Sequence, residues 1–94
     1  MLYWGVTFEF DPAKSAANLA KHGIDFEAAQ VLWLDDRKVT IPSEYVGETR
    51  KIVIGMIGDR LWAAAITLRG DAIRIISVRR ARVKEELLYE SQDD

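Results

Sequence analysis

The chain has 94 residues, of which 49% are hydrophobic and 30% are charged, a composition typical of one ordinary globular domain spanning residues 1–94. It contains no cysteine, which excludes disulfides, thiolate chemistry and cysteine-ligated zinc and fits a reducing cytoplasm. The N-terminus has no basic leader and the longest apolar run is too short to span a bilayer, so we expect neither a signal peptide nor a membrane partner.

The net charge of −2 is unevenly distributed. Residues 37–82 carry ten lysines and arginines against four acids, whereas the segments on either side are acidic. Most of these cations are arginine, the side chain suited to two-pronged phosphate contacts. The pattern has two interpretations: a nucleic-acid-binding surface, or a sheet that needs charges at its turns and edges.

The N-terminal segment predicts a strand followed by a helix. Alternation of apolar and polar residues over 6–10 favours a short strand. Asp11-Pro12 supplies an N-cap and a proline at the first helical position, and Gly23 is typical of a helix end. Small residues recur at helical spacing and predict the packing face, with polar residues opposite. The packing face is Ala13, Ala16, Ala17 and Ala20, and the opposite face is Lys14, Asn18 and Lys21.

A second helix is predicted immediately afterwards. Asp25 is a suitable N-cap for it, and Phe26, Ala29 and Trp33 lie on one side of the predicted helix. Residues 11–34 are therefore predicted to form a helical hairpin.

The middle of the chain changes to the period of strands. Three apolar runs are separated by turn residues, and Gly70-Asp71 between the last two is a signal for a two-residue hairpin. Pro42 is expected to end an additional edge strand. The predicted strands are residues 48–57, 61–69 and 72–78, with residues 37–41 as the optional edge strand.

From about residue 80 the sequence predicts a last helix. Ala81, Val83, Leu87 and Leu88 are expected to pack on the sheet, while Lys84, Glu85 and Glu90 stay in water. The predicted fold class is therefore α+β: a β-α-α unit, an antiparallel meander of three to four strands, and a C-terminal helix.

Glu48 and Arg50 are the first candidates for chemistry. They are two apart on a predicted strand and therefore project from the same face. A carboxylate beside a guanidinium can act as a base next to a phosphate clamp. The alternative interpretation is an ion pair that adds little stability.

Four arginines are the second group of candidates: Arg69, Arg74, Arg79 and Arg80. They lie at the Gly70 hairpin, on the last strand, and where that strand passes into the last helix. Three or more guanidinium groups converging there would stabilise a pentacovalent phosphate. Alternatively, Arg79 and Arg80 form salt bridges with Glu85 and Glu86. Cations at a helix N-terminus oppose its dipole, which favours the functional interpretation.

His22 is the only histidine, so a pair of histidines cannot share acid and base roles. Beside Lys21, it can act as a single acid or base, or as a structural cation at a helix C-terminus. Tyr89 and Tyr45 can stack on an RNA base, or pack their rings and leave their hydroxyls in water. The sequence contains no recognisable metal or cofactor motif, so the predicted chemistry needs neither.

Several short blocks of the chain resemble, in the same order, the BrnT toxin family. The resemblance covers residues 8–89. Its blocks are Phe8 to Lys14, Asn18, Lys21 to Ile24, Phe26 to Ala29, Gly47 to Arg50, Thr67 to Arg69, Ile73 to Ser77, Arg79 to Ala81, Glu86 and Tyr89.

The resemblance implies a RelE-like compact domain and a ribonuclease that inhibits translation by cutting RNA. It also implies a partner, a BrnA-like antitoxin with a ribbon-helix-helix part, and contact with operator DNA through that antitoxin. Residue patterns and resemblance together give these candidates: His22, Glu48, Arg50, Arg79 and Arg80 as catalytic residues, and Lys21, Arg69, Arg74 and Tyr89 as RNA-binding residues.

We expect a metal-independent endoribonuclease in which the RNA 2′-hydroxyl attacks the adjacent phosphate, with Glu48 or His22 taking its proton. The alternative is a non-catalytic module that binds the antitoxin and modulates operon repression. Residues 42–46, which depart from the Asp and His that the family usually has there, favour that alternative. Direct DNA binding is disfavoured because no predicted helix carries a basic face.

Overall fold

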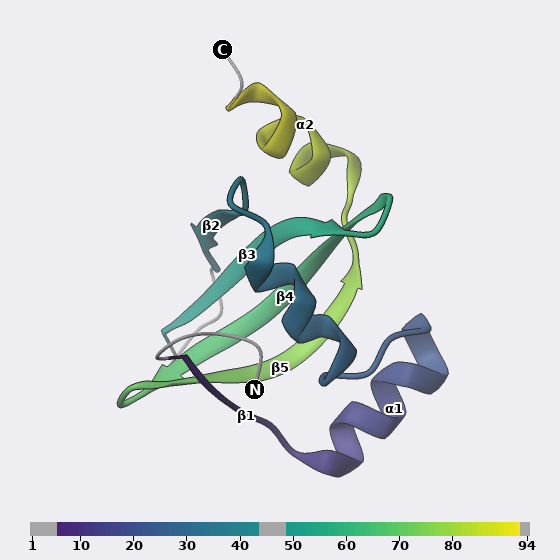
Figure 1. The fold of residues 1–94 in the computed structure, drawn as a ribbon, viewed down its shortest axis with the longest axis vertical. Helices are drawn as coiled ribbons and strands as arrows, with labels where there is room; N and C mark the ends of the chain where they lie inside the picture. Colours follow the sequence, from purple (N-terminus) through teal and green to yellow (C-terminus); the bar gives the residue numbers. More distant parts are fainter. Residues whose placement is uncertain (1–5, 44–48, 93–94) are drawn as a thin grey trace.

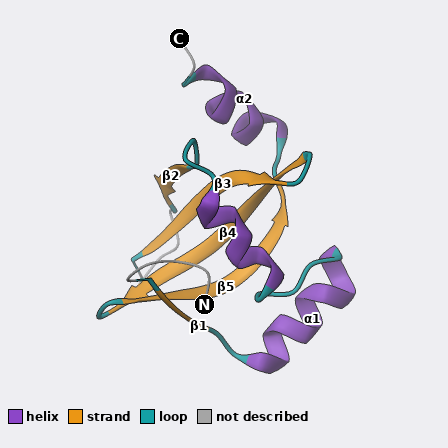
Figure 2. Cartoon of the chain, in the orientation of Figure 1, coloured by secondary structure: helices purple, strands orange, loops and turns teal. Residues whose placement is uncertain are grey.

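The computed structural model describes residues 6–43 and 49–92. Five strands form one mixed sheet in the order β1-β5-β4-β3-β2, accompanied by three helical segments (Figures 1 and 2). This confirms the predicted α+β class. The elements in chain order are β1 (Thr7–Glu9), α1 (Pro12–His22), the 3-10 helix η1 (Ala28–Leu34), β2 (Val39–Pro42), β3 (Arg50–Ile57), β4 (Arg60–Arg69), β5 (Ala72–Arg80) and α2 (Val83–Ser91).

The predicted meander is confirmed and has four antiparallel strands, β2 to β5. Two-residue turns at Gly58-Asp59 and Gly70-Asp71 join the last three strands, and both glycines have positive φ, 63° and 58°. That backbone conformation is the one that tight hairpins require. The short strand predicted over residues 6–10 is confirmed as β1, but its partner was not predicted: β1 pairs in parallel with β5 and makes the sheet mixed.

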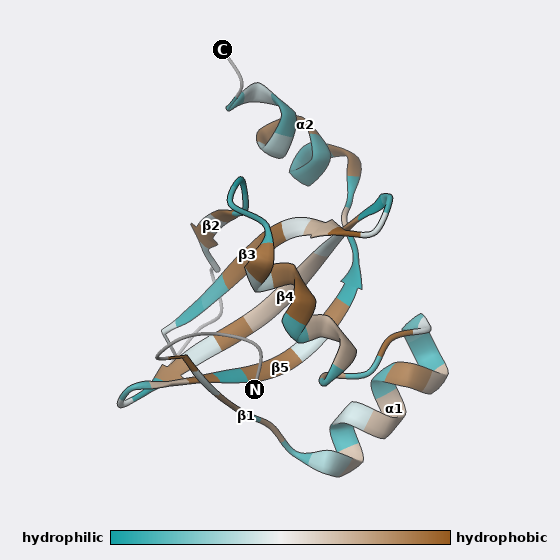
Figure 3. Cartoon of the chain, in the orientation of Figure 1, coloured by the Kyte–Doolittle hydropathy of each residue, from teal (hydrophilic) through white to brown (hydrophobic). Residues whose placement is uncertain are grey.

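Side-chain alternation gives the sheet two different faces. The first, which we call the covered face, packs against η1 and the segment before it; η1 crosses this face and is largely hydrophobic (Figure 3). The second, which we call the open face, carries a smaller cluster around Ile54 and Ala63 that is closed by Tyr89 of α2. Buried residues of the covered face are Val53, Ala64, Ile66, Ile75 and Val78, beneath Phe26, Ala29, Leu32 and Trp33.

The predicted packing face of α1 is wrong, because its alanines are exposed and its buried residues are Ser15 and Asn18. The Asn18 amide donates to the carbonyl oxygens of Ile24 and Val78, at 2.8 and 2.9 Å, and accepts from the Val78 N–H at 3.1 Å. β1 pairs only with the first residues of β5. Beyond the end of β1, the Asn18 side chain therefore bonds the backbone N–H and C=O of β5 that a neighbouring strand would otherwise bond.

The N-cap predicted at Asp11 is confirmed, since its carboxylate accepts the Ala13 N–H at 2.8 Å. The N-cap predicted at Asp25 is wrong, because the N-cap of η1 is Glu27, although the Asp25 carboxylate accepts the Ala28 N–H at 2.8 Å. The predicted helical hairpin is wrong. The second helix is a 3-10 helix, and α1 lies along β5 while η1 lies on β3 (Figure 1). The buried residues of η1 are Ala29, Gln30, Leu32 and Trp33. They recur every three residues, which is the period of a 3-10 helix.

Helix α2 also departs from the prediction. Val83, Leu87 and Leu88 are 70%, 59% and 44% exposed, whereas Glu85 and Tyr89 are buried. α2 extends away from the end of the sheet (Figure 1). Over the described residues, no helix is long and apolar enough to cross a membrane.

Candidate functional site

The strand register places four of the predicted arginines on the open face: Arg50, Arg69, Arg74 and Arg79. Arg50 and Arg74 both lie opposite Thr67, so the three residues form a row across β3, β4 and β5. Alternate residues of β4 from Ala63 to Arg69 share this face, and Arg79 lies opposite Ala63. The fold thus places on one face arginines that are far apart in the sequence.

Small side chains of β4 and β5 occupy the middle of the open face, beside Ile52 of β3. Ala65 is half-buried and lies opposite the exposed Ser77, and half-buried Thr67 follows on the same face. The Thr67 hydroxyl donates to the Thr49 carbonyl at 2.9 Å. A shallow surface with guanidinium groups around it can accept a polynucleotide backbone, because the small residues leave room and the cations meet phosphates.

Arg74 and Arg79 are held by carboxylates of the described residues. Arg74 Nη1 lies 3.2 Å from Glu9 Oε1. Arg79 donates two parallel hydrogen bonds to Glu85, at 2.8 and 2.9 Å, from a side chain that is 26% exposed. These bonds raise the pKa of Arg79 and lower the pKa of Glu85 despite the opposing effect of burial on each. Both guanidinium groups are therefore oriented, and part of their charge is compensated.

Arg80 leaves the strand on the other side. It lies opposite Trp62, on the covered-face side of the sheet, and its guanidinium carbon is 5.6 Å from the centre of the Trp62 ring. Arg79, one residue earlier, lies on the open face. The prediction that these two arginines converge on one phosphate is therefore wrong.

Tyr89 is only 9% exposed, so the prediction that it stacks on an RNA base is wrong. Its ring packs with Ile54 and Ala63, and its hydroxyl donates to Asp35 at 2.7 Å. Burial acts to raise the pKa of Asp35, but hydrogen bonds from Tyr89 and from the backbone N–H groups of Met56 and residue 37 outweigh it and lower that pKa. Burial and the Asp35 contact raise the pKa of Tyr89. The hydrogen bond between Tyr89 and Asp35 therefore helps to hold α2 against the rest of the domain.

The remaining candidates lie elsewhere or outside the described residues. Lys21 and the half-buried His22 end α1, beside β5 rather than in the row across the open face. Glu48 and Tyr45 belong to residues 44–48, outside the described part of the chain. The sequence did not point to Glu9 or Asp35, whose partners are far away in the chain. It did offer Glu85 as a salt-bridge partner of Arg79 in the structural alternative, and that ion pair is present. Glu85 is also the third residue of its helix and accepts from the Arg82 N–H at 2.8 Å.

A hollow of about 450 Å³ lies where α2 meets β2, β3 and β5. Three cations and one acid line it, together with apolar side chains of β2 and β3. Ser43, at its rim, donates its backbone N–H to the Arg50 carbonyl at 3.0 Å, which connects the hollow to the start of β3. The residues that line it are Ile41, Pro42, Ser43, Ile52, Arg79, Arg82, Lys84, Glu85 and Leu88.

A family model described as a ribonuclease toxin, BrnT, of a type II toxin–antitoxin system matches residues 10–85. The chain belongs to the BrnT family. The matched range includes all four open-face arginines and His22, and ends before Tyr89. A search of curated proteins found no match.

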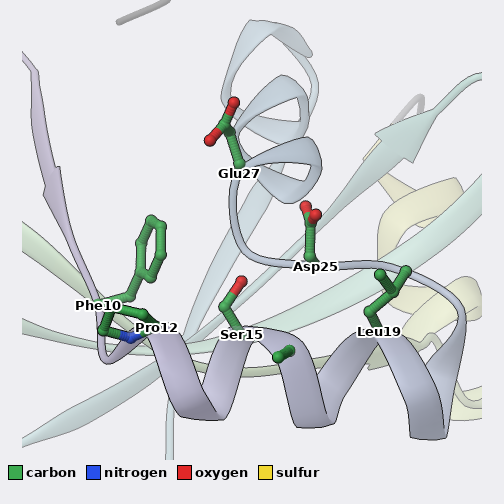
Figure 4. Close-up of a pocket in the computed structure, with 7 residues that line it drawn as sticks. Phe10, Pro12, Ser15, Leu19, Asp25 and Glu27 are labelled. Carbon is green, nitrogen blue, oxygen red and sulfur yellow. The ribbon is translucent and has the colours of Figure 1, made fainter.

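A second hollow of this BrnT domain has the opposite character. It measures about 250 Å³ and lies between α1 and the start of η1, where Asp25 and Glu27 rise opposite Ser15 and Leu19 (Figure 4). Two carboxylates repel anions such as phosphate, whereas the arginines of the open face attract them. Within the described ranges, no three His, Cys, Asp or Glu side chains are grouped so that they could hold a metal ion.

Proposed function

We propose that the chain is a metal-independent endoribonuclease toxin that inhibits translation in the cytoplasm and is neutralised by a BrnA-like ribbon-helix-helix antitoxin. Membership of a ribonuclease toxin family supports the reaction class. The observation that carries the site is the arrangement of four arginines on one face around small side chains. In this proposal RNA lies across the open face.

The reaction is an internal transfer within the RNA. The 2′-hydroxyl oxygen forms a bond to the adjacent phosphorus, and its proton passes to Glu48 or His22. The bond from phosphorus to the 5′-oxygen breaks, and that oxygen takes a proton from water, His22 or a lysine. The products are a 2′,3′-cyclic phosphate and a 5′-hydroxyl. Arginine side chains hold the phosphate and the charge that grows on it.

The ion pairs give the arginines different proposed roles in RNA binding. Arg79 and Arg74 are held by Glu85 and Glu9, so they present donors whose positions are fixed before RNA arrives. Arg69 is exposed at the end of β4, where it can meet the RNA backbone first. Lys21 and Arg80 are proposed to contact RNA that extends past the end of β5.

The proposal is tested with purified chain and a labelled single-stranded RNA in the presence of excess EDTA. We expect cleavage with cyclic phosphate ends, reduced on the order of 100-fold by Arg50→Ala and by Arg69→Ala. Arg60→Ala is the matched control, since Arg60 is an exposed arginine on the same strand but on the opposite face. Intact RNA with folded protein refutes the proposal.

The second candidate is a non-catalytic module that binds the antitoxin and modulates operon repression. It is favoured by the carboxylates that compensate Arg74 and Arg79. A chain that binds the antitoxin but leaves both RNA and growing cells unaffected would select this candidate.

A further inference from the structure

Helix α2 presents an apolar stripe to solvent. Leu87 and Leu88 are 59% and 44% exposed, and they share one side of the helix with Lys84 and Ser91, spaced by three or four residues. The side that faces the protein holds Glu85 and Tyr89 instead. Large side chains exposed in a contiguous stripe on a short helix are a feature of surfaces that bind other proteins.

The shape of the stripe suits packing against a partner helix. Leu88 and Lys84 both line the hollow beside Arg79. Together with Leu87 they also line a separate hollow of about 430 Å³ on the outer side of α2. Leu88 therefore forms a ridge between two hollows. Helices pack when the ridges of one enter the grooves of the other, so a partner helix can straddle Leu88.

The stripe borders a cationic hollow on one side. Arg79, Arg82 and Lys84 line this hollow with one acid, Glu85, whereas Glu86 and Glu90 of α2 do not line it. The cations beside Leu88 therefore favour carboxylates on the part of the partner that enters this hollow. The exposed leucines favour an apolar contact, which RNA phosphates do not provide.

We propose that the stripe of Lys84, Leu87 and Leu88 is the docking surface for an amphipathic helix of the antitoxin, with leucine-like residues on one face and carboxylates beside them. This inference rests on the proposed function for the identity of the partner, and family membership in a toxin–antitoxin system supports a partner of that kind. A helix that straddles Leu88 enters the hollow of Arg79 and blocks RNA there. Docking and neutralisation are thus the same event.

The test compares two leucines of equal exposure. Leu87 on α2 and Leu68 on β4 are both 59% exposed, so Leu87→Asp and Leu68→Asp introduce the same charge at equal solvent access. The probe is the purified product of the gene adjacent to the toxin gene. Its affinity for each folded variant is measured by calorimetry, and RNA cleavage is measured with and without it.

We expect Leu87→Asp to bind the probe on the order of 30-fold more weakly, to cleave RNA like the unaltered chain, and to resist inhibition. Leu68→Asp should bind normally, and Lys84→Glu should lower the association rate. Unchanged affinity of both α2 variants overturns the inference, as does loss of RNA cleavage with the affinity retained. A self-associated chain that Leu87→Asp converts to monomer, with normal probe affinity, also overturns it and assigns the stripe to a second copy.

The proposed function and the docking surface can fail separately. If the unaltered chain binds the probe but cuts no RNA, the enzyme proposal fails while a Leu87-dependent affinity still supports the docking surface. If RNA is cut and the probe inhibits equally in all variants, the docking surface alone is wrong.

Discussion

Arg79 and Arg80 are consecutive in the chain, yet Arg79 pairs with Glu85 on the open face while Arg80 lies over the ring of Trp62 on the other side of β5. We therefore expect Arg79→Ala to reduce kcat/KM for RNA cleavage on the order of 100-fold, as loss of a transition-state donor does. Arg80→Ala should have a clearly smaller effect.

The comparison requires that both variants be folded. Arg80→Ala removes an exposed cation–π contact, which is worth about 0.5–1 kcal/mol, so its thermal unfolding should change little. Equal losses of activity in the two variants would show that RNA passes around the end of β5 and does not lie on one face.

Glu85→Gln separates the structural role of Arg79 from its binding role. Glu85 compensates the guanidinium charge, so its neutralisation should strengthen RNA binding several-fold while destabilising the attachment of α2 by roughly 1–3 kcal/mol. RNA carrying 2′-O-methyl groups throughout binds without being cut and reports the Kd. Glu86→Gln removes the same charge one residue away and is the control. An unchanged Kd in Glu85→Gln would place Arg79 outside the RNA path.

Local signals predicted the parts of the fold that local interactions determine. The Gly70-Asp71 turn and the Asp11 cap were predicted because each depends on residues within a few positions. Asn18 was assigned to the wrong face of its helix because its partner, Val78, is sixty residues away. The same reason hid the contact between Asp35 and Tyr89, which joins residues fifty-four apart.

The candidate site was predicted as a set of residues but not as an arrangement. The basic segment contained the four open-face arginines, yet only the strand register shows that they share a face. The predicted last strand ended at Val78, whereas β5 continues to Arg80. Those two residues matter, because alternation along a strand that reaches Arg80 sends Arg79 and Arg80 to opposite sides.

Asn18→Ala should be strongly destabilising. The buried amide makes three hydrogen bonds, to Ile24 and to both backbone groups of Val78, and alanine leaves these groups unsatisfied. We expect a loss of about 2–4 kcal/mol and a fall in Tm of roughly 10 °C or more. Lys14→Ala, on the exposed side of the same helix, is the control and should leave Tm nearly unchanged. Similar melting of both variants would mean that water replaces the amide.

Gly55→Ala tests the fit between β3 and η1. A Cβ at this buried position would lie 3.0 Å from Cδ2 and 3.1 Å from Cγ of Leu32, which is fully buried. Leu32 cannot move away without disturbing the core, so we expect a cost of about 1–3 kcal/mol. Leu32→Val alone should destabilise, but in combination with Gly55→Ala the total should be less than the sum of the two. Additive free energies of unfolding in a double-mutant cycle would contradict this contact.

The attachment of α2 should depend on pH at both ends of the range. The pKa values of Glu85 and Asp35 are lowered in the folded protein, so their stabilisation is complete above the unfolded values of about 4 and is lost as the pH falls through the folded values. The pKa of Tyr89 is raised, so its contribution is complete below about pH 10 and is lost as the pH rises through the folded value.

Amide hydrogen exchange of residues 85–90, referred to that of β4 in the same sample, measures this attachment across pH. We expect protection of α2 to be greatest between about pH 5 and 9 and to fall at both extremes before that of β4. Tyr89→Phe should abolish the alkaline loss, because phenylalanine keeps the ring but has no hydroxyl to ionise. Glu85→Gln should weaken the acid loss. If α2 and β4 lose protection together at every pH, the two carboxylates hold the whole fold and not the helix alone.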